Sequence, residues 1–276
     1  GEGSLSLSMQ ATSSDVYAMS FTSTVSVPGV GSVANEDVVT YDTGTGAWAM
    51  LFDGSDVGLS SLTVDGFAIT AAGDFLLSFA ESASIAGMTG GPSGTTLDDS
   101  DIVRFIPTST GQTTAGSFVF YFDGSDVGLT QNAEDIDAIS LSSDGRLVIS
   151  LLGSGSVSGL SGIQDEDLIV FNPTSLGSAT AGTFAMYFDG SDVGLSNNSG
   201  ENIDAAAIAP DGSVILSTVG DFAVAGLSGP DEDAMAFVPT SLGGTTAGSF
   251  SQLLDLSSIG IATNADLNAF ERWSAG

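Results

Sequence analysis

One eight-residue phrase, Phe-Asp-Gly-Ser-Asp-Val-Gly-Leu, occurs three times in this chain, at 52–59, 122–129 and 188–195. A degraded fourth copy, Leu-Asp-Leu-Ser-Ser-Ile-Gly-Ile, occupies 254–261. The starts at 52, 122, 188 and 254 are 70, 66 and 66 residues apart. A recurring phrase at such a spacing indicates a repeat architecture, in which each unit packs against its neighbours. The sequence therefore predicts four tandem units, at about 1–59, 60–129, 130–195 and 196–261, followed by an extra segment at 262–276.

Within each unit, apolar and polar residues alternate with a period of two, which is typical of half-buried strands. In the third unit, such runs at 137–141, 146–152, 168–171 and 183–188 predict four strands, which we call a, b, c and d in chain order. The other units repeat them, with strand a at 65–69 and 204–208, strand b at 16–19, 75–79 and 214–217, strand c at 37–41, 101–106 and 233–238, and strand d at 47–52, 117–122 and 249–254.

Four antiparallel strands per unit are typical of the blades of a β-propeller. We therefore expect an all-β fold in which residues 1–276 form a single domain, a four-bladed β-propeller of four-stranded antiparallel blades. Long loops are expected between strands b and c and between strands c and d. The aromatic and methionine side chains that alternate along strand d are interpreted as core residues.

The first unit has two candidates for its strand a. Residues 266–270, Asp-Leu-Asn-Ala-Phe, align with 135–139, Asp-Ile-Asp-Ala-Ile, whereas residues 4–9 only alternate. Propellers need a closed ring, because an open edge of unpaired backbone groups invites association. The better match predicts that the C-terminal segment closes the first blade and that the N-terminal strand is surplus. The surplus strand either extends an edge of its own molecule or frays, or it adds to a neighbour and propagates a fibre.

The formal net charge of −31, from 34 acidic residues against three arginines, would repel phosphate backbones and anionic lipids, so we expect no nucleic-acid partner. Histidine, cysteine and lysine are all absent, which excludes imidazole, thiolate and Schiff-base chemistry. No apolar run approaches the roughly 20 residues that span a bilayer, so no membrane insertion is expected. The chain starts at Gly1 without a leader, and we expect a secreted, extracellular or cell-surface protein whose signal peptide has been removed. Halophilic adaptation is the competing explanation of the acidity.

The acidic residues concentrate where a four-stranded blade would place its d-to-a and b-to-c connections, on one face of the propeller. Crowded carboxylates repel each other unless a cation offsets them, and calcium prefers oxygen ligands. Glycines 54, 124 and 190 are expected to allow the tight turn that brings two aspartates inward. A turn closed by side-chain hydrogen bonds, or a solvated acidic face, are the alternatives. The predicted calcium ligands are Asp53, Asp56 and Asp65, then Asp123, Asp126 and Asp137, then Asp189, Asp192 and Asp204, with a fourth site weakened by Ser258.

Three phrases together resemble the tandem repeats of large secreted bacterial surface proteins. They are the octapeptide, the Asp-Glu-Asp-Leu-Ile-Val-Phe run at 165–171, and the Pro-Thr-Ser-Leu-Gly to Ala-Gly-Thr-Phe linker at 173–184. The resemblance covers nearly the whole chain and implies an extracellular β-propeller. It implies no particular activity, because a propeller hosts many functions.

These observations favour a structural protein: a calcium-stabilised subunit that assembles with copies of itself, head to tail, by exchange of a terminal strand. A calcium-dependent adhesin that binds an extracellular matrix or glycan partner through its acidic face is the alternative. Paired carboxylates can also hydrolyse glycosidic bonds without histidine, so a glycan-active enzyme is the third hypothesis. Here every acid belongs to a repeating set, so we expect no enzyme.

Overall fold

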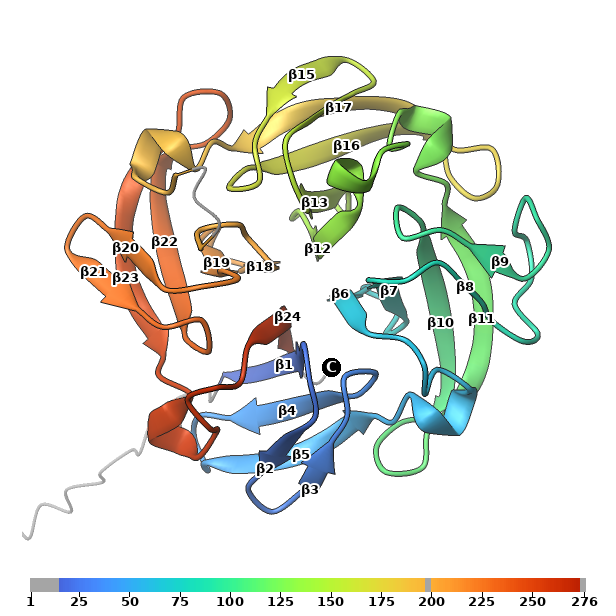
Figure 1. Ribbon diagram of the computed structural model, residues 1–276, viewed down its shortest axis with the longest axis horizontal. Coiled ribbons are helices and arrows are strands. Elements are labelled where there is room, and N and C mark those ends of the chain that lie inside the picture. Colours follow the sequence, from blue (N-terminus) through green and yellow to red (C-terminus); the bar gives the residue numbers. More distant parts are fainter. Residues whose placement is uncertain (1–14, 197–199, 274–276) are drawn as a thin grey trace, which may run out of the picture.

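The computed structural model describes residues 15–196 and 200–273, and these form a four-bladed β-propeller, as the sequence predicts (Figure 1). Each blade is a four-stranded antiparallel sheet. In order from the central axis outward, the strands are β24 (Leu267–Trp273), β1 (Val16–Phe21), β4 (Val38–Asp42) and β5 (Ala47–Phe52) in blade one; β6 (Val64–Ile69), β7 (Phe75–Phe79), β10 (Ile102–Ser109) and β11 (Ala115–Phe122) in blade two; β12 (Ile136–Leu141), β13 (Leu147–Leu151), β16 (Leu168–Ser175) and β17 (Ala181–Phe188) in blade three; and β18 (Ala205–Ile208), β19 (Val214–Ser217), β22 (Ala234–Ser241) and β23 (Ala247–Leu254) in blade four.

The C-terminal strand closes blade one, which confirms the prediction from the repeat alignment. β24 lies beside β1 in antiparallel register, from Val16 opposite Trp273 to Phe21 opposite Leu267. Blade one therefore joins strands from the two ends of the described chain (Figure 1). The alternating segment at 4–9 lies outside the described residues.

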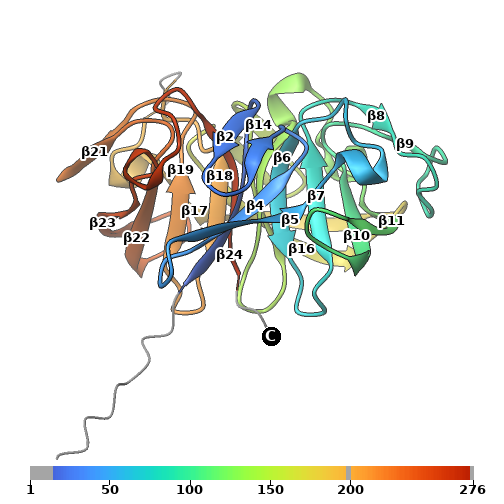
Figure 2. The same ribbon diagram turned by 90° about the horizontal axis from the view of Figure 1, so that it is seen from below.

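The connection between strands b and c folds into a second, two-stranded hairpin in every blade, where the sequence indicated only a long loop. The strands are short, so their alternation is hard to recognise in the sequence. The hairpins are β2 (Val25–Val27) with β3 (Gly31–Val33), β8 (Ala83–Ser84) with β9 (Thr96–Leu97), β14 (Gly155–Val157) with β15 (Leu160–Ile163), and β20 (Phe222–Val224) with β21 (Leu227–Gly229). Seen from the side, β2, β8, β14 and β21 lie toward the same end of the molecule (Figure 2).

The connection between strands c and d is shorter than predicted in blades two to four. The Pro-Thr-Ser phrase that looked like loop belongs to the strand, so β10, β16 and β22 extend to Ser109, Ser175 and Ser241. The register shifts directly after Pro107, Pro173 and Pro239. Proline cannot donate to the ladder, and such an irregularity accommodates it inside a sheet.

The core repeats an aromatic pattern between blades. Phe52, at the end of blade one, is fully buried and meets Phe105 of blade two edge to face, with ring centroids 5.2 Å apart. Phe122 with Phe171 and Phe188 with Phe237 repeat this contact. Aromatic pairs of this geometry contribute about 0.5–1.5 kcal/mol beyond their burial. The interpretation of the strand d aromatics as core is confirmed at these positions. No helix among the described residues is long and apolar enough to cross a membrane.

Candidate functional site

Each octapeptide forms the turn from strand d of one blade to strand a of the next. Its Ser-Asp-Val segment is one turn of 3-10 helix, η1 (Ser55–Val57), η2 (Ser125–Val127) and η4 (Ser191–Val193), and η5 (Ser257–Ile259) is the degraded copy. The first aspartate closes the turn, because its Oδ1 accepts the serine hydroxyl two residues later at 2.7 Å in all four copies. The last glycine of the octapeptide, exemplified by Gly128 with φ +102°, ends the turn in the left-handed region that favours glycine.

The first glycine of the octapeptide is needed for a different reason from the one the sequence indicated. Gly54, Gly124 and Gly190 have ordinary right-handed helical angles. A Cβ on them would lie 2.2–2.4 Å from the backbone oxygen of Glu36, Ser100 or Glu166. The glycine therefore permits a close approach between the octapeptide and the segment that precedes strand c.

A second aspartate, just before strand c, binds the octapeptide within each blade. The Oδ1 atoms of Asp101 and Asp167 accept the backbone N–H of Gly124 and Gly190, both at 3.1 Å, and their Oδ2 atoms accept a backbone N–H three residues earlier. Asp37 and Asp233 accept the N–H of Gly54 and Leu256 in the same way. None of these four aspartates is among the predicted calcium ligands. Their constant separation of 23 residues from the bonded amide in three of four blades was the available signal.

The carboxyl groups of these aspartates are buried. Burial raises the pKa of Asp101 and of Asp167 to about 6, while the backbone N–H bonds act in the opposite direction. Both side chains are at least nine-tenths buried. The carboxylates of this set therefore serve the turn and hold it against strand c.

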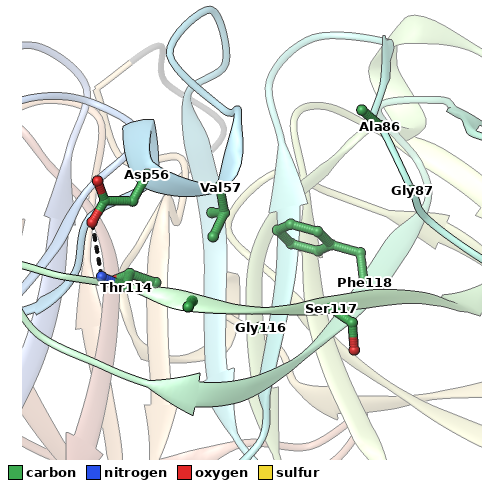
Figure 3. A pocket seen from close by; sticks show the side chains of 9 residues that line it. Asp56, Val57, Ala86, Gly87, Thr114, Gly116, Ser117 and Phe118 are labelled. Carbon is green, nitrogen blue, oxygen red and sulfur yellow. Dashed lines mark hydrogen bonds between the residues drawn. The ribbon is translucent and has the colours of Figure 1, made fainter.

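The octapeptide also holds the next blade. The Thr114 backbone N–H donates to Asp56 Oδ2 at 2.8 Å (Figure 3). The Asp53 backbone N–H donates to Thr114 Oγ1 at 2.9 Å. Gly111 N donates to Leu51 O at 2.7 Å beside them. We call this set of bonds the inter-blade clasp. A pocket beside it, lined by Val57, Thr114 and Phe118 among others, lies where the two blades meet (Figure 3).

Among the described residues, the whole clasp recurs between blades three and four, part of it recurs between blades two and three, and it is missing between blades four and one. The backbone N–H groups of Asp123 and Asp189 donate to the hydroxyl oxygens of Thr180 and Thr246, and the Thr246 backbone N–H donates to Asp192 Oδ2. The Thr-Ala-Gly phrases at 114–116, 180–182 and 246–248 supply these threonines. Blade one lacks that phrase, and the octapeptide that faces it has Ser258 in place of the second aspartate. There Trp48 Nε1 donates to Ile259 O at 3.4 Å instead.

The nine predicted calcium ligands divide into two places. The octapeptide aspartates lie at the blade junctions, and Asp53, Asp56 and Asp192 accept hydrogen bonds there. Asp65, Asp137 and Asp204 lie on or next to β6, β12 and β18, the innermost strands around the axis (Figure 1). Within 15–196 and 200–273, no group of three or more acidic side chains is placed to hold a metal ion. Calcium at the octapeptides stays a prediction, and melting in EDTA against added calcium tests it.

Asp65, Asp137, Asp204 and Asn268 occupy equivalent positions on the four innermost strands, and we call them the axial ring. Asn268 Nδ2 donates to Asp65 Oδ1 at 2.9 Å, and Asn202 Nδ2 donates to Asp137 Oδ2 at 2.8 Å. Burial raises the pKa of Asp65 to about 8, of Asp137 to about 7, and of Asp204 well above its usual range. Neighbouring aspartates act in the same direction at each of them.

No model of a known protein family matches the chain, and no curated protein matches it. Among solved structures, it is similar to virginiamycin B lyase from Staphylococcus aureus, at 10% identity and a TM-score of 0.32 over 86% of this chain and 73% of that one. It is also similar to YCF48 bound to a D1 peptide, at 10% identity and a TM-score of 0.29 over 83% of this chain and 50% of that one. The extracellular domain of a putative hybrid two-component system of B. thetaiotaomicron matches at 11% identity and a TM-score of 0.33, over 87% of this chain and 40% of that one. The chain thus spans half or less of two of these proteins, and at such scores the likeness carries no argument about function.

Proposed function

We propose that this protein is an extracellular structural subunit that polymerises head to tail, by adding the alternating N-terminal segment of one copy to the outer edge of β23 in the next. The proposal needs a strand without a place in its own propeller and an edge that can receive it. β24 fills the innermost position of blade one, the position for which residues 4–9 and 266–270 were the two candidates in the sequence. The non-catalytic role is part of the proposal, since the repeated carboxylates hold backbone N–H groups.

The observation that carries the proposal is the edge of blade four. The outer strands of the other blades receive backbone bonds: Gly111 N donates to Leu51 O on β5, Gly177 N to Tyr121 O on β11, and Gly243 N to Tyr187 O on β17. Loops add Thr89 to the edge of β11 and Ser158 to the edge of β17. In the part of the chain that the structure describes, no backbone N–H from beyond β22 donates to β23. Unpaired strand edges of this kind bind an added strand through main-chain hydrogen bonds.

The side chains of β23 and of residues 4–9 are also compatible with strand addition. Ser249, Ser251 and Gln252 are exposed on β23, which makes its surface polar. The segment at 4–9, Ser-Leu-Ser-Leu-Ser-Met, alternates serine with apolar residues. An added strand of this pattern places its serines on one side and its leucines on the other. Because donor and acceptor lie on different surfaces, the contact is heterologous, and such contacts form open chains unless the rotation closes a ring.

Deletion of residues 1–10 tests the donor. The full chain is expected to form filaments in negative-stain electron microscopy, whereas the truncated chain stays monomeric in light scattering and keeps the circular dichroism of the folded propeller. Unchanged assembly after the deletion, or a full chain that is monomeric at every concentration, contradicts the proposal.

Gln252→Pro tests the acceptor edge. Thr89 O accepts the Phe120 N–H on β11, and Gln252 is the equivalent residue of β23, so its N–H should point outward. Proline removes that donor and crowds an incoming strand. Gln252→Ala is the matched control, because both substitutions remove the side-chain bond from Gln252 to Asp233. Assembly should fail with proline and persist with alanine, and equal behaviour of the two would place the interface elsewhere.

The alternative is a propeller that binds an extracellular ligand through calcium on its acidic face. The acidic segments before strand c favour it, because they gather near the octapeptides. A monomeric full chain that binds immobilised glycan or matrix protein only with calcium would support this alternative.

A further inference from the structure

In the described chain, the axial ring has a junction where two acids meet and no amide donates to the ring member, Asp204. Two residues before Asp204 stands Asn202, and two residues before Asn268 stands Asp266. Each of them approaches the ring member of the preceding blade. Asn202 does so from blade four and donates to Asp137 of blade three. Asp266 holds the same position in blade one, and it interacts with Asp204 of blade four. An amide therefore stands between blades three and four, but a second carboxylate stands between blades four and one. Asp135 is a second carboxylate near Asp65 as well, but there Asn268 donates to Asp65.

The oxygens at this junction lack hydrogen-bond donors. Asp204 is 1% exposed, and neither of its carboxylate oxygens has a partner. Asp266 Oδ1 and Asn202 Oδ1 are also buried without a partner, and Asn202 is 6% exposed. Leaving buried polar atoms unpaired is costly, and an unpaired buried charge costs more. Such unpaired oxygens indicate that a species other than the protein's own hydrogen-bond donors is bound to them.

A shared proton, a water molecule and a metal cation can each bridge facing carboxylates, but a water molecule offsets none of their charge. One proton satisfies one oxygen from each acid, and it leaves the second Asp204 oxygen and Asn202 Oδ1 without partners. A calcium ion accepts six to eight oxygens, including carboxylate, amide and water oxygens. Asp137 and Asp231 add negative potential, since Asp137 acts on both acids and Asp231 acts on Asp266. The cation accounts for more of the unpartnered oxygens.

The geometry points to a single calcium site on the propeller axis, in which Asp204 and Asp266 bridge the ion between blades four and one and Asn202 Oδ1 adds a neutral oxygen. Only two of its ligands are acidic, so water completes the shell and enters past the partly exposed Asp266. This site differs from calcium at the octapeptides, because it forms once in the molecule and at the junction that lacks the inter-blade clasp. It joins the last blade to the strand that closes the ring.

Asp266→Asn tests the site by rebuilding the arrangement seen between Asn202 and Asp137. The new amide should donate to Asp204 and remove one buried charge. The metal-free variant should therefore melt at a higher temperature than the metal-free native chain. Calcium should raise the melting temperature of the native chain, and this calcium response should be lost in the variant. Asp221→Asn, an exposed residue on the loop before β20, removes the same charge and should keep the native response.

Equilibrium dialysis with calcium alone, after EDTA has been removed, provides the second measurement. The native chain should bind one ion that Asp266→Asn and Asp204→Asn both lose, while Asp221→Asn retains it. A calcium response of native size in Asp266→Asn overturns the axial site. A native chain that binds no calcium, combined with a more stable Asp266→Asn, also overturns it and assigns the junction to a shared proton.

Discussion

At the scale of single residues, the described chain uses many of its carboxylates to hold backbone N–H groups. Asp101 holds two at once, Gly124 N on the octapeptide and Asp98 N before strand c. Both bonds lie in a region where Asp101 is 6% exposed. The repetition of acidic residues therefore has a structural cause that requires no ion, namely the need of each blade to fasten its d-to-a turn.

Asp101→Ala should lower the free energy of unfolding by about 2–4 kcal/mol, because two buried N–H donors lose their acceptor. Asp101→Asn keeps one acceptor oxygen and should lose about half as much. Urea denaturation measures both, with the exposed Asp126→Asn as a neutral control. Equal stability of the alanine and asparagine variants would show that the carboxylate does not hold both amides.

A buried acid in the closing strand predicts a dependence on pH. Burial raises the pKa of Glu271 from 4.5 to about 8, although hydrogen bonds from the Arg272 and Ile69 backbone act in the opposite direction. The folded chain binds this proton more tightly than the unfolded chain. Stability should therefore be highest below about pH 4.5 and should decline as the pH rises through 8.

Glu271→Gln should remove this part of the decline. We expect similar melting temperatures for variant and native chain at pH 4.5, and at pH 9 a variant more stable by about 5 kcal/mol, at about 1.4 kcal/mol per pKa unit. Asp65 and Asp137 also have raised pKa values, so a residual slope remains. Asp221→Asn serves as the control that keeps the full slope. A native chain whose stability rises from pH 5 to 9 would contradict the assignment.

At the scale of elements, two devices hold the blades together. The inter-blade clasp pairs an octapeptide with the Thr-Ala-Gly phrase of the next blade, and within the described residues it is absent where both partners have changed. β24 closes the ring by pairing with β1. The degraded fourth octapeptide lies at the junction between blades four and one. That junction is held instead by the Trp48 hydrogen bond and by the closing strand β24.

Phe270→Ala should weaken ring closure. Phe270 on β24 is 1% exposed, and its ring centroid lies 5.0 Å from that of Tyr17 on β1. Truncation of a buried phenylalanine costs about 3–5 kcal/mol. Val238→Ala, at a side chain that is 56% exposed, should change stability by less than about 0.5 kcal/mol. Urea denaturation of both variants checks the prediction, and a loss below 1 kcal/mol for Phe270→Ala would contradict it.

At the scale of the whole molecule, repulsion between the acidic side chains destabilises the folded state. The chain carries a net charge of −31, and its three arginines pair with Asp74, Asp144 and Asp15. The rest of the acidic surface repels itself in the folded state more than in the expanded chain. Added salt screens exposed charges that lie farther apart than about 10 Å at 0.1 M.

Raising sodium chloride from 10 to 500 mM should therefore increase the melting temperature by about 2–6 °C, corresponding to about 1–2 kcal/mol. Tetramethylammonium chloride should act equally, because screening does not require a bound cation. A melting temperature that is independent of both salts would show that the surface charges do not oppose folding.

The sequence by itself determined the repeat, the strand alternation, the four blades and the closing role of residues 266–270. These features depend on local periodicity and on alignment between units, which are visible along the chain. The short hairpins between strands b and c escaped recognition because strands of two to four residues show too little alternation. The extension of strand c through Pro-Thr-Ser was not predicted, because proline usually indicates a loop.

Only the tertiary structure decided what each repeated residue does. Asp56 bonds Thr114, 58 residues away in the chain, and Gly54 is required by the approach of Glu36. Asp65 and Asp53 look alike in sequence, but one lies on the axis and the other at a blade junction. The difference between Asn202 and Asp266 becomes meaningful only when the ring closes, because closure brings Asp266 to Asp204. Such contacts depend on how blades are placed around an axis, which no local pattern contains.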